Sequence, residues 1–104
     1  MKENEAIDII YEGLIGDKSI PNDLRMNKKL DYHRLENIVS AINFLIIFYK
    51  EKSSIPKKLA YCFVDVYGLF QFKQDFFSEE ILIEYENIGV KLQELGYQLF
   101  NVYE

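Results

Sequence analysis

The feature that most constrains the fold of this chain is a regular apolar spacing near its C-terminus. Between residues 79 and 102 the apolar side chains recur at alternating steps of three and four. This row consists of Ile81, Tyr85, Ile88, Leu92, Leu95, Leu99 and Val102. Such steps place side chains on one face of an α-helix, whereas a half-buried strand alternates every second residue. With Ser78 as N-cap and Glu79 and Glu80 in the positive first turn, the row predicts a helix over residues 78–102.

Three further segments show helical spacing. The first covers residues 5–15, with Asn4 as its predicted N-cap. The second covers residues 31–52 and is apolar nearly all round, so we expect it at the centre of the domain. The third covers residues 56–72, because the proline at its start suits the first helical turn, where its missing N–H leaves no hydrogen bond unmade.

Two short stretches, SIPNDL at 19–24 and SIPKKL at 54–59, raise the alternative of a helical repeat array. After the shared letters the segments diverge, and the residues from Gly89 on, where a third copy would begin, do not resemble them. Stacked repeats need about three units to bury a core, so both stretches are better explained as helix starts. We therefore predict an all-α fold in which residues 1–104 form a single four-helix-type bundle, with a short extra turn or 3-10 segment near residues 20–28.

Gly89 and Gly96 interrupt the last predicted helix, where each costs about 1 kcal/mol relative to alanine. They are seven residues apart and therefore lie on one side of the helix, in a column with Leu82 and Tyr103. We expect this side to face a neighbouring helix at short range, because a missing side chain lets two backbones approach closely.

Composition limits the class of protein. A chain of 104 residues with 49% apolar side chains suits one globular domain. Its one cysteine, Cys62, cannot form an internal disulfide, which favours a reducing compartment. The first ten residues are acidic where a secretory signal is basic and then apolar. The longest apolar stretch, residues 41–49, is far shorter than the ~20 residues that a bilayer requires. We expect a cytoplasmic protein that does not bind membranes.

The net charge of −5 is unevenly distributed along the chain. Residues 1–17 carry five acidic side chains and one basic, residues 18–64 carry four acidic and nine basic, and residues 65–104 carry eight acidic and two basic. The acidic ends argue against a direct nucleic-acid ligand, because phosphate contacts need a dominant basic surface. A basic protein partner suits this distribution better.

The sequence contains no motif for catalysis. Cys62 and His33 are the one cysteine and the one histidine, and they lie on different predicted helices. A buried structural thiol therefore explains Cys62 better than a catalytic pair does. Zinc needs three or four close Cys or His ligands, and a di-iron bundle needs Glu-x-x-His on two helices; the sequence has neither. We expect no catalytic, metal or cofactor site, and a protein that is not an enzyme.

A second apolar row lies on the last predicted helix, away from the first. Ile83, Val90 and Tyr97 recur every seven residues, and Phe100 follows three residues later. The acidic residues that border this row are Glu79, Glu80, Glu86 and Glu94. An apolar centre with a charged rim is typical of a protein interface. The alternative is that the helix packs between two neighbours and buries both rows, which we favour because small bundles often need every apolar face.

Another candidate contact lies in the third predicted helix. At helical spacing Asp65 lies beside Tyr61, one turn before it, and on the same side as Phe72, two turns after it. A carboxylate among aromatic side chains suits a cationic residue of a partner, since tyrosine and arginine are enriched in interface hot spots. An ordinary exposed aspartate beside an exposed tyrosine is the simpler interpretation, because isolated exposed aromatic residues are common.

In size, negative charge and aromatic content, with eight Phe and eight Tyr, the whole chain resembles the small immunity proteins that bacteria make against colicins and contact-delivered toxins. The nearest local similarity is DVY at 65–67. The adjacent tyrosines of the colicin DNase immunity proteins are missing, so the binding residues of those proteins are not carried over. The resemblance implies an inhibitor, monomeric or weakly dimeric, that covers the basic active or substrate-binding surface of a toxin domain such as a nuclease.

Two other classes of protein fit the same sequence. A phage-type inhibitor or nucleic-acid mimic would direct the acidic surface against a host nuclease. A structural or regulatory homodimeric adaptor would pair the second apolar row of the last helix with its own copy. A toxin gene immediately upstream would favour immunity, and light scattering would reveal a dimer.

Overall fold

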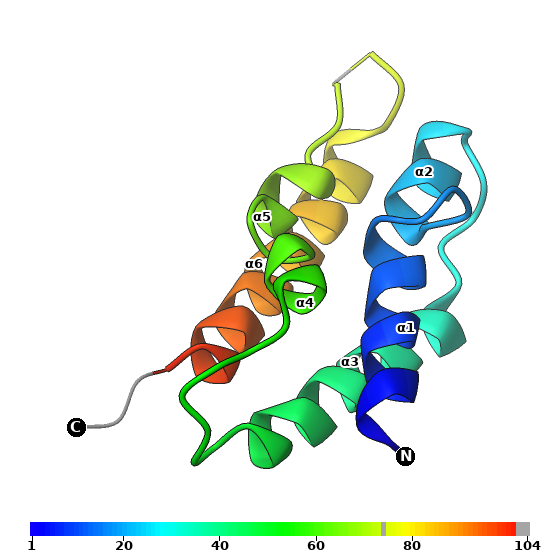
Figure 1. Ribbon diagram of the computed structural model, residues 1–104. Coiled ribbons are helices and arrows are strands. Elements are labelled where there is room, and N and C mark those ends of the chain that lie inside the picture. The colour runs from blue at the N-terminus through cyan, green and yellow to red at the C-terminus, as the bar shows by residue number, and fades with distance from the viewer. Residues whose placement is uncertain (74, 102–104) are drawn as a thin grey trace.

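The computed structural model describes residues 1–73 and 75–101, and its regular elements in this part of the chain are α-helices (Figure 1). The long helices are α1 (Glu3–Leu14), α3 (Tyr32–Phe48) and α6 (Glu79–Leu99). The short helices are α2 (Ile20–Arg25), α4 (Lys57–Tyr61) and α5 (Val66–Leu69). The described residues contain no strand, so the predicted all-α class is confirmed.

The helices form a four-membered bundle in which two short helices together take the place of one long helix. α1 packs against α3, α3 packs against α6, α6 packs against α5, and α4 packs against α1. Figure 1 shows α3 and α6 running in roughly the same direction. The extra element predicted near residues 20–28 is α2, which is a short α-helix and packs against α1. The predicted helical bundle is therefore confirmed.

The core lies where α3 meets α1 and α6. The fully buried side chains of α3 are Ile38, Ala41, Ile42 and Leu45. The contacts of α3 with both α1 and α6 agree with the central position predicted for residues 31–52. The outer side of α3 is nevertheless open to solvent, since Ile47 is 76% exposed. Apolar residues on all sides of a helix therefore do not show that neighbouring helices bury all of its sides.

The single helix predicted over residues 56–72 is wrong, because the chain leaves α-helical geometry at residues 62–65. The backbone N–H groups of residues 62, 63 and 64 bond to carbonyls three residues back, at 3.1, 3.0 and 3.4 Å. Asp65 has φ −135° and ψ 39°, and a new helix begins at Val66. The inward-facing row survives the break. Of the predicted row Leu59, Phe63, Val66 and Phe70, all but Phe63 are buried; Phe63 is partly buried, and the neighbouring Cys62 is fully buried. Apolar spacing therefore predicted the inward side but not the continuity of the helix.

Of the two predicted N-caps, the one near the C-terminus is confirmed and the one near the N-terminus is wrong. The Ser78 hydroxyl accepts a hydrogen bond from the backbone N–H three residues on, at 3.3 Å, so the cap predicted for α6 is confirmed. Asn4 is not the cap of α1, because helical hydrogen bonding already starts at the carbonyl of Lys2. Val102, the last residue of the predicted helix, and Tyr103, which was placed in the column of the two glycines, lie outside the described residues.

Arg34 of α3 makes hydrogen bonds to the end of α1 and to the chain segment that joins α1 to α2. Its guanidinium donates to the carbonyl oxygen of Lys18 and, at 3.1 Å, to that of Glu12 near the end of α1. It also lies 3.8 Å from the carboxylate of Asp23 in α2. One side chain therefore satisfies carbonyls at a helix C-terminus, where backbone acceptors lack intrahelical partners.

Gly89 and Gly96 allow α6 to approach the broken helix closely. A Cβ on Gly89 would lie 3.1 Å from the carbonyl oxygen of Tyr67 and 3.2 Å from the Cβ of Phe70. A Cβ on Gly96 would lie 2.8 Å from the ring of Phe63. Both glycines are buried. The prediction that they face a neighbouring element at short range is confirmed, and that neighbour is α5 with the segment before it.

The double substitution Gly89→Leu with Gly96→Leu tests this packing. Removing two glycines raises helix propensity by roughly 1 kcal/mol each, but overpacking costs roughly 1–3 kcal/mol at each site. Because the neighbour of Gly89 is backbone that cannot move aside, we expect a net loss of about 1–3 kcal/mol in urea unfolding. Asn87→Leu on the exposed side of α6 is the control and should be near neutral. A double variant as stable as the parent would refute the close approach.

Candidate protein interface

The outer side of α6 carries an apolar strip that no described helix covers. Ile83 is 54% exposed, Val90 37% and Tyr97 68%. These three residues, the α6 outer strip, are two helical turns apart and share one side of the helix. α6 packs against α3 and α5, and the side chains that it buries are Tyr85, Leu92, Leu95 and Leu99. The favoured interpretation that α6 buries both of its apolar rows is therefore wrong.

Carboxylates surround the α6 outer strip. The acidic rim consists of Glu79, Glu80, Glu84, Glu86 and Glu94, all of them exposed. Glu84 was not singled out from the sequence, although its position one turn after Glu80 is a signal that would have found it. Lys91 is the one basic residue among residues 75–101. Like charges gathered on one helix produce a negative potential that attracts a basic partner.

Phe100 does not extend the strip as predicted. It follows the last residue of α6 and is partly buried, and its ring packs against the ring of Phe63 at 5.7 Å between centroids. Its side chain therefore belongs to the contact between α6 and the segment that precedes α5. Because the helix ends at Leu99, helical spacing no longer places the following residue.

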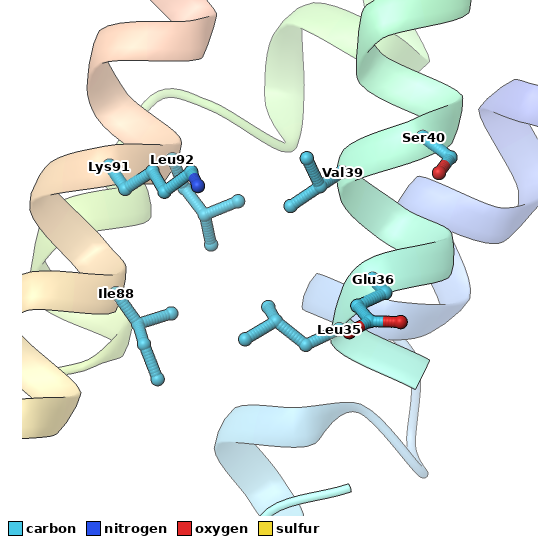
Figure 2. A pocket seen from close by; sticks show the side chains of 7 residues that line it. All are labelled: Leu35, Glu36, Val39, Ser40, Ile88, Lys91 and Leu92. Carbon is cyan, nitrogen blue, oxygen red and sulfur yellow. The ribbon is translucent and has the colours of Figure 1, made fainter. Parts of the chain in front are cut away.

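A groove lies between α3 and α6, beside the α6 outer strip. Figure 2 shows Leu35 and Val39 of α3 pointing across to Ile88 and Leu92 of α6. Its volume is about 360 Å³, and its remaining lining residues are Glu36, Ser40 and Lys91. We call this the α3–α6 groove. The sequence interpretation assigned its apolar residues to the core and so missed it.

The groove and the strip are continuous. A shallower hollow on α6 shares Ile88 and Lys91 with the α3–α6 groove and reaches Ile83 of the strip. Glu80 and Glu84 of the acidic rim also line this hollow. A partner that contacts the first half of the strip therefore also meets the mouth of the groove.

Tyr61 and Asp65 are exposed at the break between α4 and α5. Tyr61 is 61% exposed and Val64 is 81% exposed, and Asp65 is exposed beside them. The contact between Phe63 and Gly96 joins this segment to α6 one residue before Tyr97. The two surfaces that the sequence suggested separately thus lie on elements that touch each other.

Phe72 does not share a surface with Asp65 as the sequence suggested. Its ring makes edge contacts with Phe77 at 5.4 Å and with Tyr85 at 5.6 Å, and the guanidinium of Arg25 lies 5.8 Å from its centroid. The prediction failed because it assumed one continuous helix, whereas α5 ends at Leu69 and the chain then changes direction.

Cys62 is a core residue. It is fully buried, and its thiol donates to the carbonyl oxygen of Lys58 at 3.3 Å. Burial raises the pKa of the Cys62 thiol to about 11, against the opposing charge of Lys58. The thiol is therefore protonated at neutral pH and a poor nucleophile.

His33 is exposed on α3. In the part of the chain that the structure describes, no group of three or more His, Cys, Asp or Glu side chains is placed to hold a metal ion.

The raised pKa of Cys62 predicts a loss of stability at alkaline pH. The unfolded chain releases the thiol proton near pH 8.5, whereas the folded chain retains it to about pH 11. The thiol therefore leaves the free energy of unfolding unaffected below about pH 8.5 and lowers it as the pH rises toward 11. Between pH 7.5 and 10 we expect the parent to lose about 1–2 kcal/mol more than Cys62→Ala in denaturant unfolding.

This comparison isolates the thiol from the tyrosines. Burial, together with a hydrogen bond to Glu3, also raises the pKa of Tyr49, but that contribution is present in both proteins. Equal slopes of stability against pH in the parent and in Cys62→Ala would contradict the prediction.

No protein-family model matches this chain, and comparisons with curated proteins and with solved structures give no match. Among the described residues no helix is both long and apolar enough to span a bilayer. The functional conclusion therefore rests on the surface of α6 and its surroundings.

Proposed function

We propose that this chain is an immunity-type protein, which acts in the cytoplasm and neutralises a basic toxin domain by covering its active or substrate-binding surface. The observation that carries the proposal is the α6 outer strip, an exposed apolar row framed by the acidic rim. Interfaces combine an apolar, aromatic centre with a polar border in this way. The protein would be a binding protein and not an enzyme.

The charge of the surface favours a basic partner over a second copy of this chain. In a symmetric dimer built on the α6 outer strip, each copy would set its own acidic rim against the same rim of the other. Like charges held together at an interface cost several kcal/mol, so the adaptor alternative is disfavoured. A basic toxin domain meets the same surface with complementary charge and is also steered toward it in solution.

The double reversal Glu80→Lys with Glu86→Lys tests the role of the rim. The partner to measure is the product of the reading frame immediately upstream of the gene for this chain, which the proposal expects to contain a basic toxin domain. We expect association to slow about tenfold at low salt and to become less sensitive to salt, because steering by exposed charges is screened. Stopped-flow association at two salt concentrations gives both quantities.

The matched control is Glu5→Lys with Asp17→Lys, which changes the net charge equally but on α1 and the loop after it. The same slowing in the control would show that only net charge matters. Unchanged kinetics in the rim variant would remove α6 from the interface. A partner that proves to be a host nuclease would favour the alternative of a phage-type inhibitor or nucleic-acid mimic.

Asp65→Lys tests the second predicted contact. Asp65 is exposed, so the stability of the free protein should change by no more than about 0.5 kcal/mol. If Asp65 pairs with a cation in a buried interface, the reversal should weaken binding by roughly 2–5 kcal/mol. Asp65→Asn, which keeps the shape but removes the charge, should weaken binding less. Titration calorimetry against the same domain, with thermal melts, measures both effects. Parental affinity in Asp65→Lys would exclude this residue from the interface.

A further inference from the structure

The α3–α6 groove exposes apolar surface that the fold itself does not use. Leu35, Val39 and Ile88 are only partly buried, while Leu92 is buried beneath them. Figure 2 shows these side chains facing one another across an open gap from two different helices. A volume of about 360 Å³ lies in the range of sites that receive small ligands or single large side chains.

Polar groups define one end and the walls of the groove. The hydroxyl of Tyr32 in the first turn of α3 donates to the carboxylate of Glu84 on α6 at 2.5 Å. This hydrogen bond joins the two helices one turn before Leu35 and Ile88. Glu36 lines the groove from α3, and Lys91 lines it from α6.

The charge around the groove indicates what kind of residue fits it. Glu36, Glu80 and Glu84 lie on the groove or on the hollow that continues from it, against the single cation of Lys91. An apolar floor within a mostly negative border suits a large apolar side chain that is flanked by lysine or arginine. An acidic or purely polar segment would bury unpaired charge here.

We infer that the α3–α6 groove is the anchor pocket of the interface and receives a leucine, methionine or aromatic side chain from a basic segment of the toxin domain. The inference rests on the proposed function and names the part of the partner that binds most firmly. Hot-spot residues of interfaces cluster in such pockets, where surrounding contacts exclude water. The α6 outer strip and the acidic rim surround the anchor.

Val39→Phe tests the anchor by filling the groove from within. The control is Ile47→Phe, which adds the same ring on the exposed side of the same helix. The probe is the purified product of the upstream reading frame, in which the proposed function expects a basic domain. We expect Val39→Phe to weaken binding at least tenfold, mainly through faster dissociation, and Ile47→Phe to bind as the parent does. Thermal melts confirm that both variants are folded.

Two further measurements address the groove directly. In the parent, methyl NMR signals of Leu35, Val39 and Ile88 should shift when the basic domain binds. In Lys91→Glu, removal of the one cation should speed association about threefold at low salt. Slower association in Lys91→Glu would show that the partner is not basic at this point and would overturn the inference.

The outcomes separate the anchor from the proposed function. If Val39→Phe binds like the control, or if the groove methyl signals do not move, the anchor is refuted. The proposed function still stands in that case if the reversal of Glu80 and Glu86 slows association. If the basic domain does not bind at all, both proposals fail. If Val39→Phe instead disrupts a dimer of this chain, the occupant is a second copy and the inference is overturned.

Discussion

The close approach of α6 to α5 at Gly89 and Gly96 determines which side of α6 faces solvent. With backbone and ring atoms about 3 Å from the positions where Cβ atoms would lie, this side of α6 is fully occupied. A second side packs on α3 through residues such as Leu92. α6 is therefore held on two adjoining sides, and the remaining side carries Ile83, Val90 and Tyr97 into water. The candidate interface follows from the way in which the core is packed.

Much of this fold was predictable because its long helices have an inward row that apolar spacing reveals. In α6, the N-cap Ser78, the contact role of the glycines and the burial of Tyr85, Leu92, Leu95 and Leu99 were predicted from the sequence and are confirmed. The predicted row is not buried along its whole length, because Ile81 is 39% exposed and Ile88 is only partly buried. The break at residues 62–65 was not predicted. Turns whose N–H groups bond to carbonyls three residues back keep nearly the same side chains inward, so the apolar spacing hardly changes there. Spacing reports which residues are buried, and a local switch of hydrogen-bond partner leaves that pattern almost unchanged.

The candidate site was less predictable for a different reason. An apolar row is visible in a sequence, but whether a neighbour covers it depends on how many helices surround it. The favoured interpretation expected two neighbours to bury both rows of α6. α6 does have two neighbours, α3 and α5, but they cover adjoining sides of the helix and leave its second row exposed. Phe72 and Phe100 were misplaced because helical spacing was extended beyond the ends of α5 and α6. The α3–α6 groove joins residues about fifty positions apart, and only the tertiary structure brings them together.

In the proposed complex, this surface would use two interactions that act at different stages of binding. The exposed carboxylates of the acidic rim act over distance and raise the rate of encounter with a basic partner, but each is screened and contributes little to the lifetime of a complex. The strip and the groove act only on contact, and burying their apolar area slows dissociation. Both lie on helices whose inner sides are anchored in the core, so little ordering is required when a partner binds. One face of this chain thus combines features that suit both requirements of the proposed inhibitor, rapid capture and slow release.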